Sequence, residues 1–108
     1  MSQYKSIEWR EGLVRMLDQH KLPLTTSYID YTDYREVADA IRTMVIRGAP
    51  AIGAAAAYGM ALAALHSEAE TPNQLKGLIA AAGNLLRESR PTAVNLFWAI
   101  ERMEDKLL

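Results

Sequence analysis

The residues with the clearest chemical potential lie in an arginine–proline segment near the middle of the chain. It reads Arg47-Gly48-Ala49-Pro50 and leads into an alanine-rich run. Proline suits the first turn of a helix because its missing N–H would be unpaired there in any case. The free N–H groups of a helix start, together with the positive end of the helix dipole, favour anions. Arg47 adds a forked donor that matches phosphate oxygens, and Gly48 lets the backbone approach a ligand closely. The segment predicts a binding site for a phosphate monoester.

A second arginine–proline pair, Arg90-Pro91, repeats this arrangement some forty residues further on. Pro91 disfavours helical backbone at Arg90 and can itself open a helix, which places Arg90 at another helix start. Two arginines at two helix starts in one small domain could bind the same dianion. The plainer alternatives are an exposed loop position for Arg47 and an ion pair between Arg90 and Glu88, and the sequence leaves both open.

Catalytic groups are not evident in the same pattern. Asn95 follows Arg90 closely and could contact a ligand or satisfy a neighbouring backbone group. The chain has no cysteine, which excludes a thiol nucleophile and thiolate metal sites within it. His20 and His66 have no acidic or histidine partner at ligand spacing, so we expect no metal site. The carboxylates between residues 30 and 39 fit helix caps and solvent-facing positions rather than an acid–base pair. We therefore expect binding residues here and no catalytic residue.

The segments that must position these residues begin with strands. Ile7 and Trp9 alternate with polar residues, residues 11–12 read Glu-Gly and can form a tight turn, and residues 13–17 form a second strand. Residues 24–31 are rich in threonine, tyrosine and isoleucine, which favour strands. The simplest arrangement is an antiparallel sheet of about three strands.

Helical periodicity replaces the strand pattern after residue 32. Asp33 with Glu36 predicts a capping box, residues 50–66 predict a helix of small side chains, Thr71 caps a third helix and Pro91 opens a fourth. The fold class is therefore α+β, with a small sheet followed by a bundle of about four helices. The first, third and fourth predicted helices are expected to face inward with these residues: Tyr34, Val37, Ala38, Ile41 and Val45; Leu75, Leu78, Ile79, Ala82, Leu85 and Leu86; Ala93, Leu96, Phe97, Ile100, Met103 and Leu107.

Bulk composition excludes several classes of protein. The chain has 108 residues, 23% of them charged, and a formal net charge of -1, which fits one globular domain and argues against a general nucleic-acid or membrane-surface binder. No signal peptide is apparent at the amino terminus. The run 49–65 is mostly alanine and is interrupted by glycine, so it predicts a buried helix rather than a membrane span. We expect a cytoplasmic protein.

Both arginine–proline segments resemble the methylthioribose-1-phosphate isomerase family. The resemblance is carried by residues 44–53, Met-Val-Ile-Arg-Gly-Ala-Pro-Ala-Ile-Gly, and by residues 90–96, Arg-Pro-Thr-Ala-Val-Asn-Leu; residues 7–9 and 22–23 fit as well. It covers essentially the whole chain, but only the amino-terminal domain of that family. The fourth helix carries no stop signal before Leu108, so we expect residues 1–108 to be one domain of a larger isomerase.

The resemblance implies a metal-free, cofactor-independent isomerisation of methylthioribose 1-phosphate to methylthioribulose 1-phosphate in methionine salvage. It implies substrate contacts from Arg47, Gly48, Ala49 and Arg90. It places the catalytic cysteine and aspartate in a larger, Rossmann-like carboxy-terminal domain that this chain lacks, so this chain alone is expected to be inactive. The implied partners are a sugar phosphate, that second domain and a second subunit in a homodimer.

A non-catalytic role is the alternative. The regulatory subunits related to initiation factor 2B share the architecture that the resemblance implies, and such a domain would act by binding other proteins. Phe97 and Trp98 lie on adjacent faces of the fourth predicted helix, so one small sheet cannot bury both. We therefore expect an exposed apolar face where the missing domain would pack.

Overall fold

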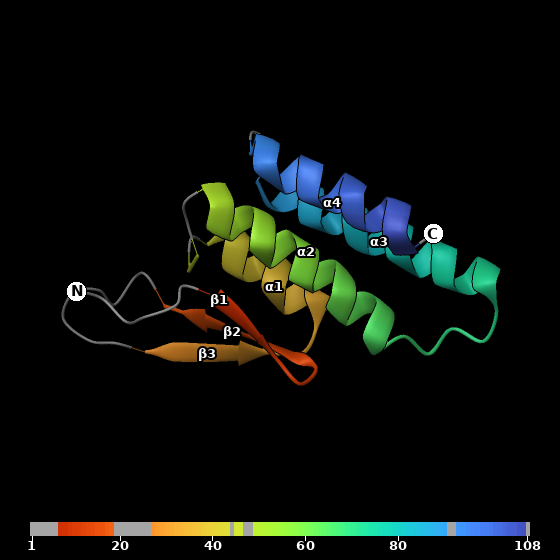
Figure 1. Cartoon of the computed structure of the whole chain (residues 1–108), viewed down its shortest axis with the longest axis horizontal. Helices are drawn as coiled ribbons and strands as arrows, with labels where there is room; N and C mark the ends of the chain where they lie inside the picture. The colour runs from red at the N-terminus through yellow and green to blue at the C-terminus, as the bar shows by residue number, and fades with distance from the viewer. Residues whose placement is uncertain (1–6, 19–26, 44, 47–48, 91–92, 108) are drawn as a thin grey trace.

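The amino-terminal part of the chain forms a three-stranded antiparallel sheet, shown with the rest of the computed structural model in Figure 1. The structure describes residues 7–18, 27–43, 45–46, 49–90 and 93–107. Strand β1 (Ile7–Arg10) turns through Glu11-Gly12 into β2 (Leu13–Leu17), and β3 (Tyr28–Tyr31) pairs with the other side of β2. Both turn residues have positive φ, 47° and 88°, as the tightest hairpin turns require. The predicted hairpin and three-stranded sheet are confirmed.

Strand alternation sends one face of the sheet to the core. Val14 and Met16 on the central strand are fully buried. Their neighbours on the edge strands are also apolar, and they are Trp9, Tyr31, Ile7 and Ile29. A shift of one residue would turn this whole set outward, so the apolar alternation fixes the register.

Helix α1 (Tyr34–Arg42) follows the sheet directly and begins at the predicted cap. The Asp33 carboxylate accepts a hydrogen bond of 2.8 Å from the backbone N–H of Arg35, which satisfies one of the free donors of the first turn. The reciprocal half of the predicted capping box is wrong, because among the described residues the Glu36 side chain makes no hydrogen bond to the backbone N–H of Asp33; the Glu36 N–H instead donates to the Asp33 carbonyl at 3.0 Å. Asp33 instead also pairs with the Arg35 guanidinium at 3.1 Å.

Helices α2 (Ala49–Leu65) and α3 (Pro72–Ser89) fall where the sequence predicts them. The Thr71 hydroxyl accepts from the backbone N–H of Gln74 at 3.2 Å, and the Gln74 side chain accepts from the N–H of Glu70 at 2.7 Å. This reciprocal cap, with proline in the first turn, fixes where α3 begins.

Helix α4 (Val94–Leu107) completes the chain. Its predicted first residue, Pro91, lies outside the described residues. Ile79, Leu86, Leu96 and Ile100 are fully buried, which confirms the centre of the predicted stripes on α3 and α4. The prediction that Leu85 faces inward is wrong, since its side chain is 36% exposed. It stands at the edge of the α3 stripe, where the layer beneath no longer covers it.

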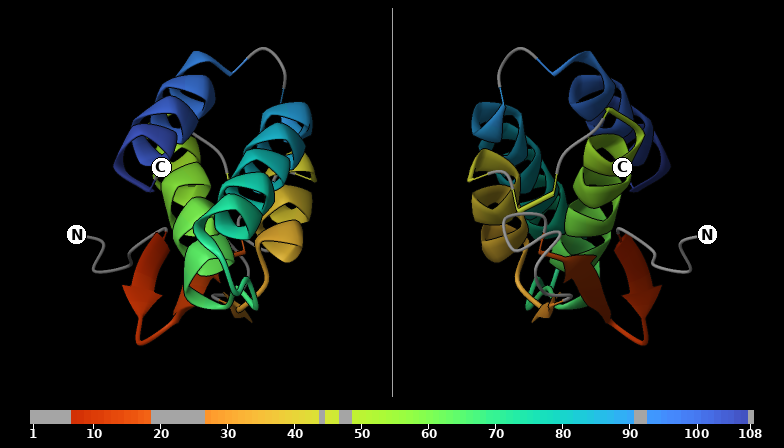
Figure 2. Two further views of the ribbon diagram at one scale, coloured as in Figure 1. Left: turned by 90° about the vertical axis from the view of Figure 1, so that its right-hand side faces the viewer. Right: turned by 90° about the vertical axis from the view of Figure 1, so that its left-hand side faces the viewer.

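The elements stack in three layers (Figure 1). The sheet packs against α1 and α2, and α3 and α4 cover the other side of those two helices. Viewed along their length, the four helices form a bundle with the sheet against one side (Figure 2). The predicted α+β class and its order, sheet then helices, are confirmed. Within the described residues, no helix is long and apolar enough to cross a membrane.

Candidate functional site

The two predicted binding segments lie at the same end of the bundle. Helices α2 and α4 run side by side in the same direction, so both begin at the left-hand end in Figure 1, which faces the viewer in the right-hand panel of Figure 2. Their first turns approach closely: a Cβ placed on Gly53 would lie 3.5 Å from the carbonyl oxygen of Asn95 and 3.7 Å from its Cβ. The fold therefore brings together two helix starts that are some forty residues apart in sequence.

The first segment is placed by its flanks. Arg47 and Gly48 lie outside the described residues. Ile46, directly before them, is fully buried, and Ala49, directly after them, is the first residue of α2.

Arg90 stands where α3 ends and the chain turns toward α4. Its backbone is non-helical, with φ −147° and ψ 82°, as expected for a residue before proline. Its carbonyl accepts from the N–H of Ala93 at 3.0 Å. Its Nη1 is buried and has no hydrogen-bond partner among the described residues. The alternative of an ion pair with Glu88 does not form in the described part of the chain.

The electrostatics at the starts of α2 and α4 favour an anion. The first turns of α2 and α4 contain no acidic residue, so no carboxylate there neutralises the positive ends of the two helix dipoles. A buried donor without a partner is uncommon, because leaving it unpaired costs the full desolvation of the group. An anion within reach of Arg90 Nη1 would provide the missing acceptor.

Asn95 sits one residue into α4 and is half-buried against α2. It lies at the same end of the bundle as Arg90 and lines the hollow between α2 and α4. Its close approach to Gly53 is not apparent from the sequence, which predicts only that Gly53 packs against some other element. The one signal in the sequence is the helical spacing of small residues along α2, which indicates the face of the helix that another element approaches closely.

A hollow of about 600 Å³ lies at the opposite end of the helices, where α1 begins and α2 ends. It is lined by residues around the start of α1 and the end of α2, including Asp33, Arg35 and His66. These groups have other partners: Asp33 caps α1, Arg35 stacks over Tyr34 at 4.9 Å, and His66 Nε2 lies 2.9 Å from the Gly12 carbonyl. The hollow holds none of the predicted binding residues, and we do not assign it to the site.

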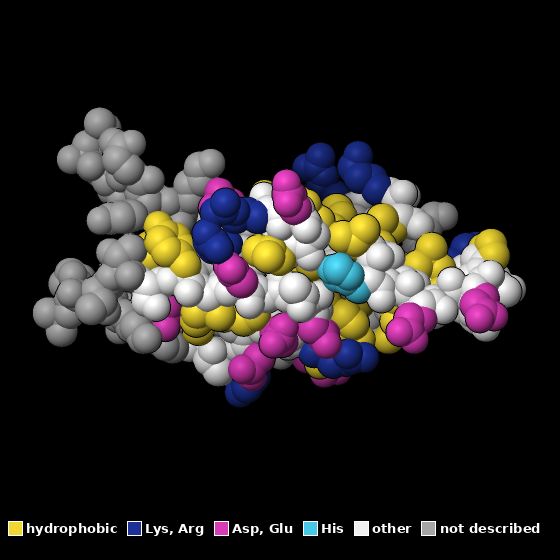
Figure 3. All heavy atoms as spheres, turned by 90° about the horizontal axis from the view of Figure 1, so that it is seen from below, with side chains coloured by type: hydrophobic (Ala, Val, Ile, Leu, Met, Phe, Trp, Pro, Cys, Tyr) yellow, Lys and Arg dark blue, Asp and Glu magenta, His cyan; other side chains and the backbone are white. Residues whose placement is uncertain are grey.

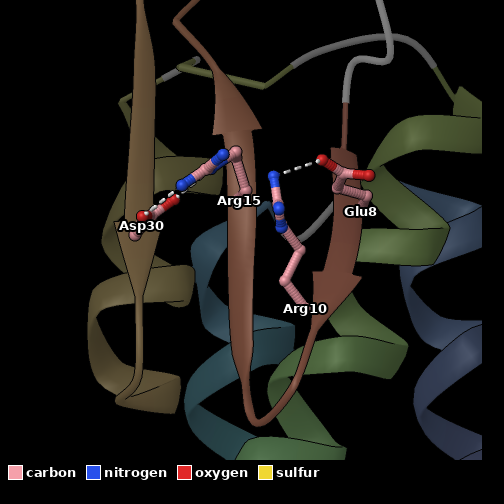
Figure 4. Close-up of polar contacts among 4 residues, drawn as sticks. All are labelled: Glu8, Arg10, Arg15 and Asp30. Atoms are coloured by element: carbon pink, nitrogen blue, oxygen red, sulfur yellow. Dashed lines mark hydrogen bonds and ion pairs between the residues drawn. The ribbon is translucent and has the colours of Figure 1, made fainter.

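Charged side chains on the outer face of the sheet pair with one another (Figure 4). Arg15 forms two hydrogen bonds with Asp30 across β2 and β3, at 2.6 and 2.9 Å, and Arg10 lies 3.5 Å from Glu8. The hydrogen bonds from Arg15 hold the pKa of Asp30 below its usual range. Seen from this side, acidic and basic side chains are intermixed rather than gathered by sign (Figure 3).

Metal-binding clusters do not occur in the described ranges: nowhere there do three or more histidines, cysteines or carboxylates gather as ligands. His20 lies outside those ranges.

Comparison with known proteins bears on this same part of the chain. The sequence model of the Initiation factor 2 subunit family matches residues 45–108, a range that includes both arginine–proline segments. This is more than half of the chain. The chain belongs to the Initiation factor 2 subunit family.

Among curated members similar to this chain are proteins named methylthioribose-1-phosphate isomerase. The one from Syntrophotalea carbinolica is 53% identical over 102 residues, which are 94% of this chain and 30% of that protein. The one from Pseudomonas fluorescens is 52% identical over 103 residues, 95% of this chain and 28% of that protein. The chain thus spans about 30% of the length of the curated relatives it matches.

Solved structures with the same fold carry two different names. The crystal structure of 5-methylthioribose 1-phosphate isomerase from Pyrococcus horikoshii has a TM-score of 0.91 and 41% identity over 94% of this chain and 29% of that one. The crystal structure of the translation initiation factor eIF-2B, subunit delta, from A. fulgidus has a TM-score of 0.87 and 45% identity over 93% of this chain and 29% of that one. Family membership is therefore compatible with an isomerase and with an initiation-factor subunit.

Proposed function

We propose that this chain is the amino-terminal domain of a methylthioribose-1-phosphate isomerase and supplies part of its phosphate site. The observation that carries the proposal is the pairing of two helix starts at one end of the bundle, where the buried Nη1 of Arg90 has no partner within the described structure. Identity above 50% to isomerases over nearly the whole chain supports the same function.

Each residue of the site has a simple role in this proposal. Arg47 and Arg90 donate charged hydrogen bonds to phosphate oxygens, and the backbone N–H groups of Gly48 and Ala49 complete the anion site. Asn95 donates to or accepts from a sugar hydroxyl. Holding the phosphate at one end of the sugar fixes the position of the carbons between which the proton moves, and correct positioning alone lowers the barrier considerably.

The groups that move that proton belong to the remainder of the longer protein. An aldose–ketose isomerisation needs a base near the sugar carbons, and no acid–base pair stands near the helix starts in the described residues. We propose that a Rossmann-like carboxy-terminal domain carries a catalytic cysteine and aspartate, that no cofactor takes part, and that the enzyme works in the cytoplasm as a homodimer. The 108 residues alone should then show no isomerisation above the buffer rate.

The test uses the full-length protein that contains this chain. A charged hydrogen bond contributes about 1.5–3 kcal/mol, so Arg90→Ala and Arg47→Ala should each lower kcat/KM for methylthioribose 1-phosphate by roughly one to two orders of magnitude. Arg90→Lys keeps the charge but loses the forked pair of donors, so its kcat/KM should lie between those of the wild type and Arg90→Ala. Arg10→Ala is the matched control, since Arg10 is an exposed arginine on the outer face of the sheet, and it should leave kcat/KM unchanged.

Wild-type rates for Arg90→Ala and Arg47→Ala would remove these residues from the site. A full-length protein without isomerase activity would favour the second function, a non-catalytic domain that binds other proteins. The observation that favours it is the match to the initiation factor subunit, together with the exposed Trp98 on α4. Phosphate binding by the full-length protein separates the two, because the second function does not require it.

A further inference from the structure

Helices α2 and α4 form an apolar groove that the other described elements leave uncovered. Its hollow is about 440 Å³, and its floor consists of Gly53 and Ala54 together with Ala57, which follows about one helical turn later on α2. Trp98 forms part of the wall and is 62% exposed. Val94, one turn before Trp98, is 59% exposed. An indole and a β-branched side chain side by side at this exposure mark a contact surface more often than a free one.

The length of the relatives indicates what covers the groove. Chains that match nearly all of these residues are about three times as long, since the match is 29–30% of their length. Lys106 lines one end of the groove. The relatives therefore contain enough further protein to cover a groove of this size.

The opposite end of the groove is at the helix starts. Pro50 and Asn95 line it there, next to the proposed phosphate site. Under the proposed function, a second domain must reach this end to bring catalytic groups to the sugar. A domain that reaches this end of the groove and also covers Trp98 would lie along the groove.

The charged lining of the groove is basic. Arg102 and Lys106 follow Trp98 at successive turns of α4 and both line the groove, which includes no acidic side chain in the described residues. A surface packed there needs an apolar centre to receive the indole and acidic groups opposite the two cations.

We propose that the groove between α2 and α4 is the seat of the following domain of the full-length protein, with Trp98 as its central anchor. The inference rests on the proposed function in one respect, that these residues are the amino-terminal domain of a longer chain. It goes further in assigning the face, the anchor residue and the charge of the opposing surface. The alternative occupant is a second copy of this chain, in which case the grooves of the two copies would face each other and bring their basic side chains together.

Oxidative footprinting of the full-length protein tests this assignment, with mass spectrometry of the individual side chains. Trp9 is the internal reference, because it has the same side chain and is half-buried in the described structure. If the groove is covered, Trp98 reacts more slowly than Trp9, and this protection is unchanged on dilution. The double variant Arg102→Glu/Lys106→Glu should make Trp98 react faster, whereas Arg42→Glu, a control on exposed Arg42 of α1, should not.

Three outcomes overturn the assignment. If Trp98 reacts faster than Trp9, the groove is open. If the protection of Trp98 is lost on dilution, a second copy covers the groove. If the protection is unchanged in the double variant, no acidic surface lies opposite Arg102 and Lys106. Isomerase activity measured on the same preparation reports separately on the proposed function. An active enzyme with a fast-reacting Trp98 would keep the function and discard this docking surface.

Discussion

Arg90 illustrates how one side chain can indicate a ligand. A buried donor without a partner costs about 1–3 kcal/mol, and more when the group is charged. Among the described residues nothing offsets this cost for Arg90 Nη1. The carboxylate that the sequence suggests as a partner, Glu88, is exposed and does not pair with it. A bound phosphate would turn the same buried nitrogen into a favourable contact.

Tyr31 gives a prediction at the same scale. Burial raises the pKa of its phenol to about 12, and the nearby carboxylates Asp18, Glu36 and Asp39 add to the effect. In the unfolded chain the phenol ionises near 10. Between these two values the unfolded state has lost a proton that the folded state keeps, so stability is complete below the lower value and falls as pH rises toward the upper one.

We expect the free energy of unfolding to decline in that alkaline range by at most about 1.4 kcal/mol per pH unit from this group. Urea denaturation at a series of pH values measures the slope, and Tyr31→Phe should flatten it. Tyr28→Phe is the control, because Tyr28 is 42% exposed on the same strand. Equal slopes for the wild type and Tyr31→Phe would show that Tyr31 titrates normally.

At the scale of the elements, small residues decide how closely the helices approach. Gly59 on α2 faces α1 and α3 together: an added Cβ would lie 3.2 Å from Val37 Cγ1 and 3.3 Å from two methyl groups of Leu86. Gly53, two turns earlier, faces α4 at Asn95 instead. The small side chains of α2 thus let it lie at the centre of the bundle, in contact with the three other helices.

A pair of identical substitutions separates packing from helix propensity. Replacing a helical glycine by alanine stabilises a helix by roughly 0.5–1 kcal/mol. Gly77 of α3 has no atom within 4 Å of an added Cβ, so Gly77→Ala should raise the free energy of unfolding by about that amount. Gly59→Ala should lower it, because overpacking typically costs about 1–3 kcal/mol.

Urea denaturation of both variants measures the difference. The m-value should stay constant if only stability changes. A stabilised Gly59→Ala would mean that α1 and α3 move apart without cost, and that the close approach is not a constraint on the fold.

At the scale of the whole molecule, the sheet is attached to the bundle on one side only. It touches α1 and α2, whereas α3 and α4 pack on the far side of those helices (Figure 1). The Trp9 and Tyr58 rings, 5.8 Å apart, join β1 to α2. Pairs of aromatic rings at this distance contribute about 0.5–1.5 kcal/mol beyond the area they bury.

We therefore expect Trp9→Ala to loosen the sheet before the helices. Removing a large buried aromatic costs about 3–5 kcal/mol, and Trp9 is half-buried, so roughly half of that loss is expected. Hydrogen exchange should accelerate at β1 and β2 amides and change little in α3. Uniform acceleration across the chain would show instead that the sheet and the helices unfold as one unit.

The sequence by itself determined the class of the fold and most of its element boundaries. The Glu11-Gly12 turn, the Asp33 and Thr71 caps and the helical apolar stripes depend on local backbone chemistry, which a single segment carries. It also identified Arg47, Gly48, Ala49 and Arg90 as residues suited to an anion, and these remain predictions.

Only the tertiary structure decided what lies beside what. The common direction of α2 and α4, the unpaired nitrogen of Arg90 and the exposure of Leu85 all depend on packing between segments far apart in the chain. Local propensity does not distinguish a glycine that faces solvent, such as Gly77, from one that faces two helices, such as Gly59. The physical reason is that burial and pairing are properties of the space between elements, which no element specifies alone.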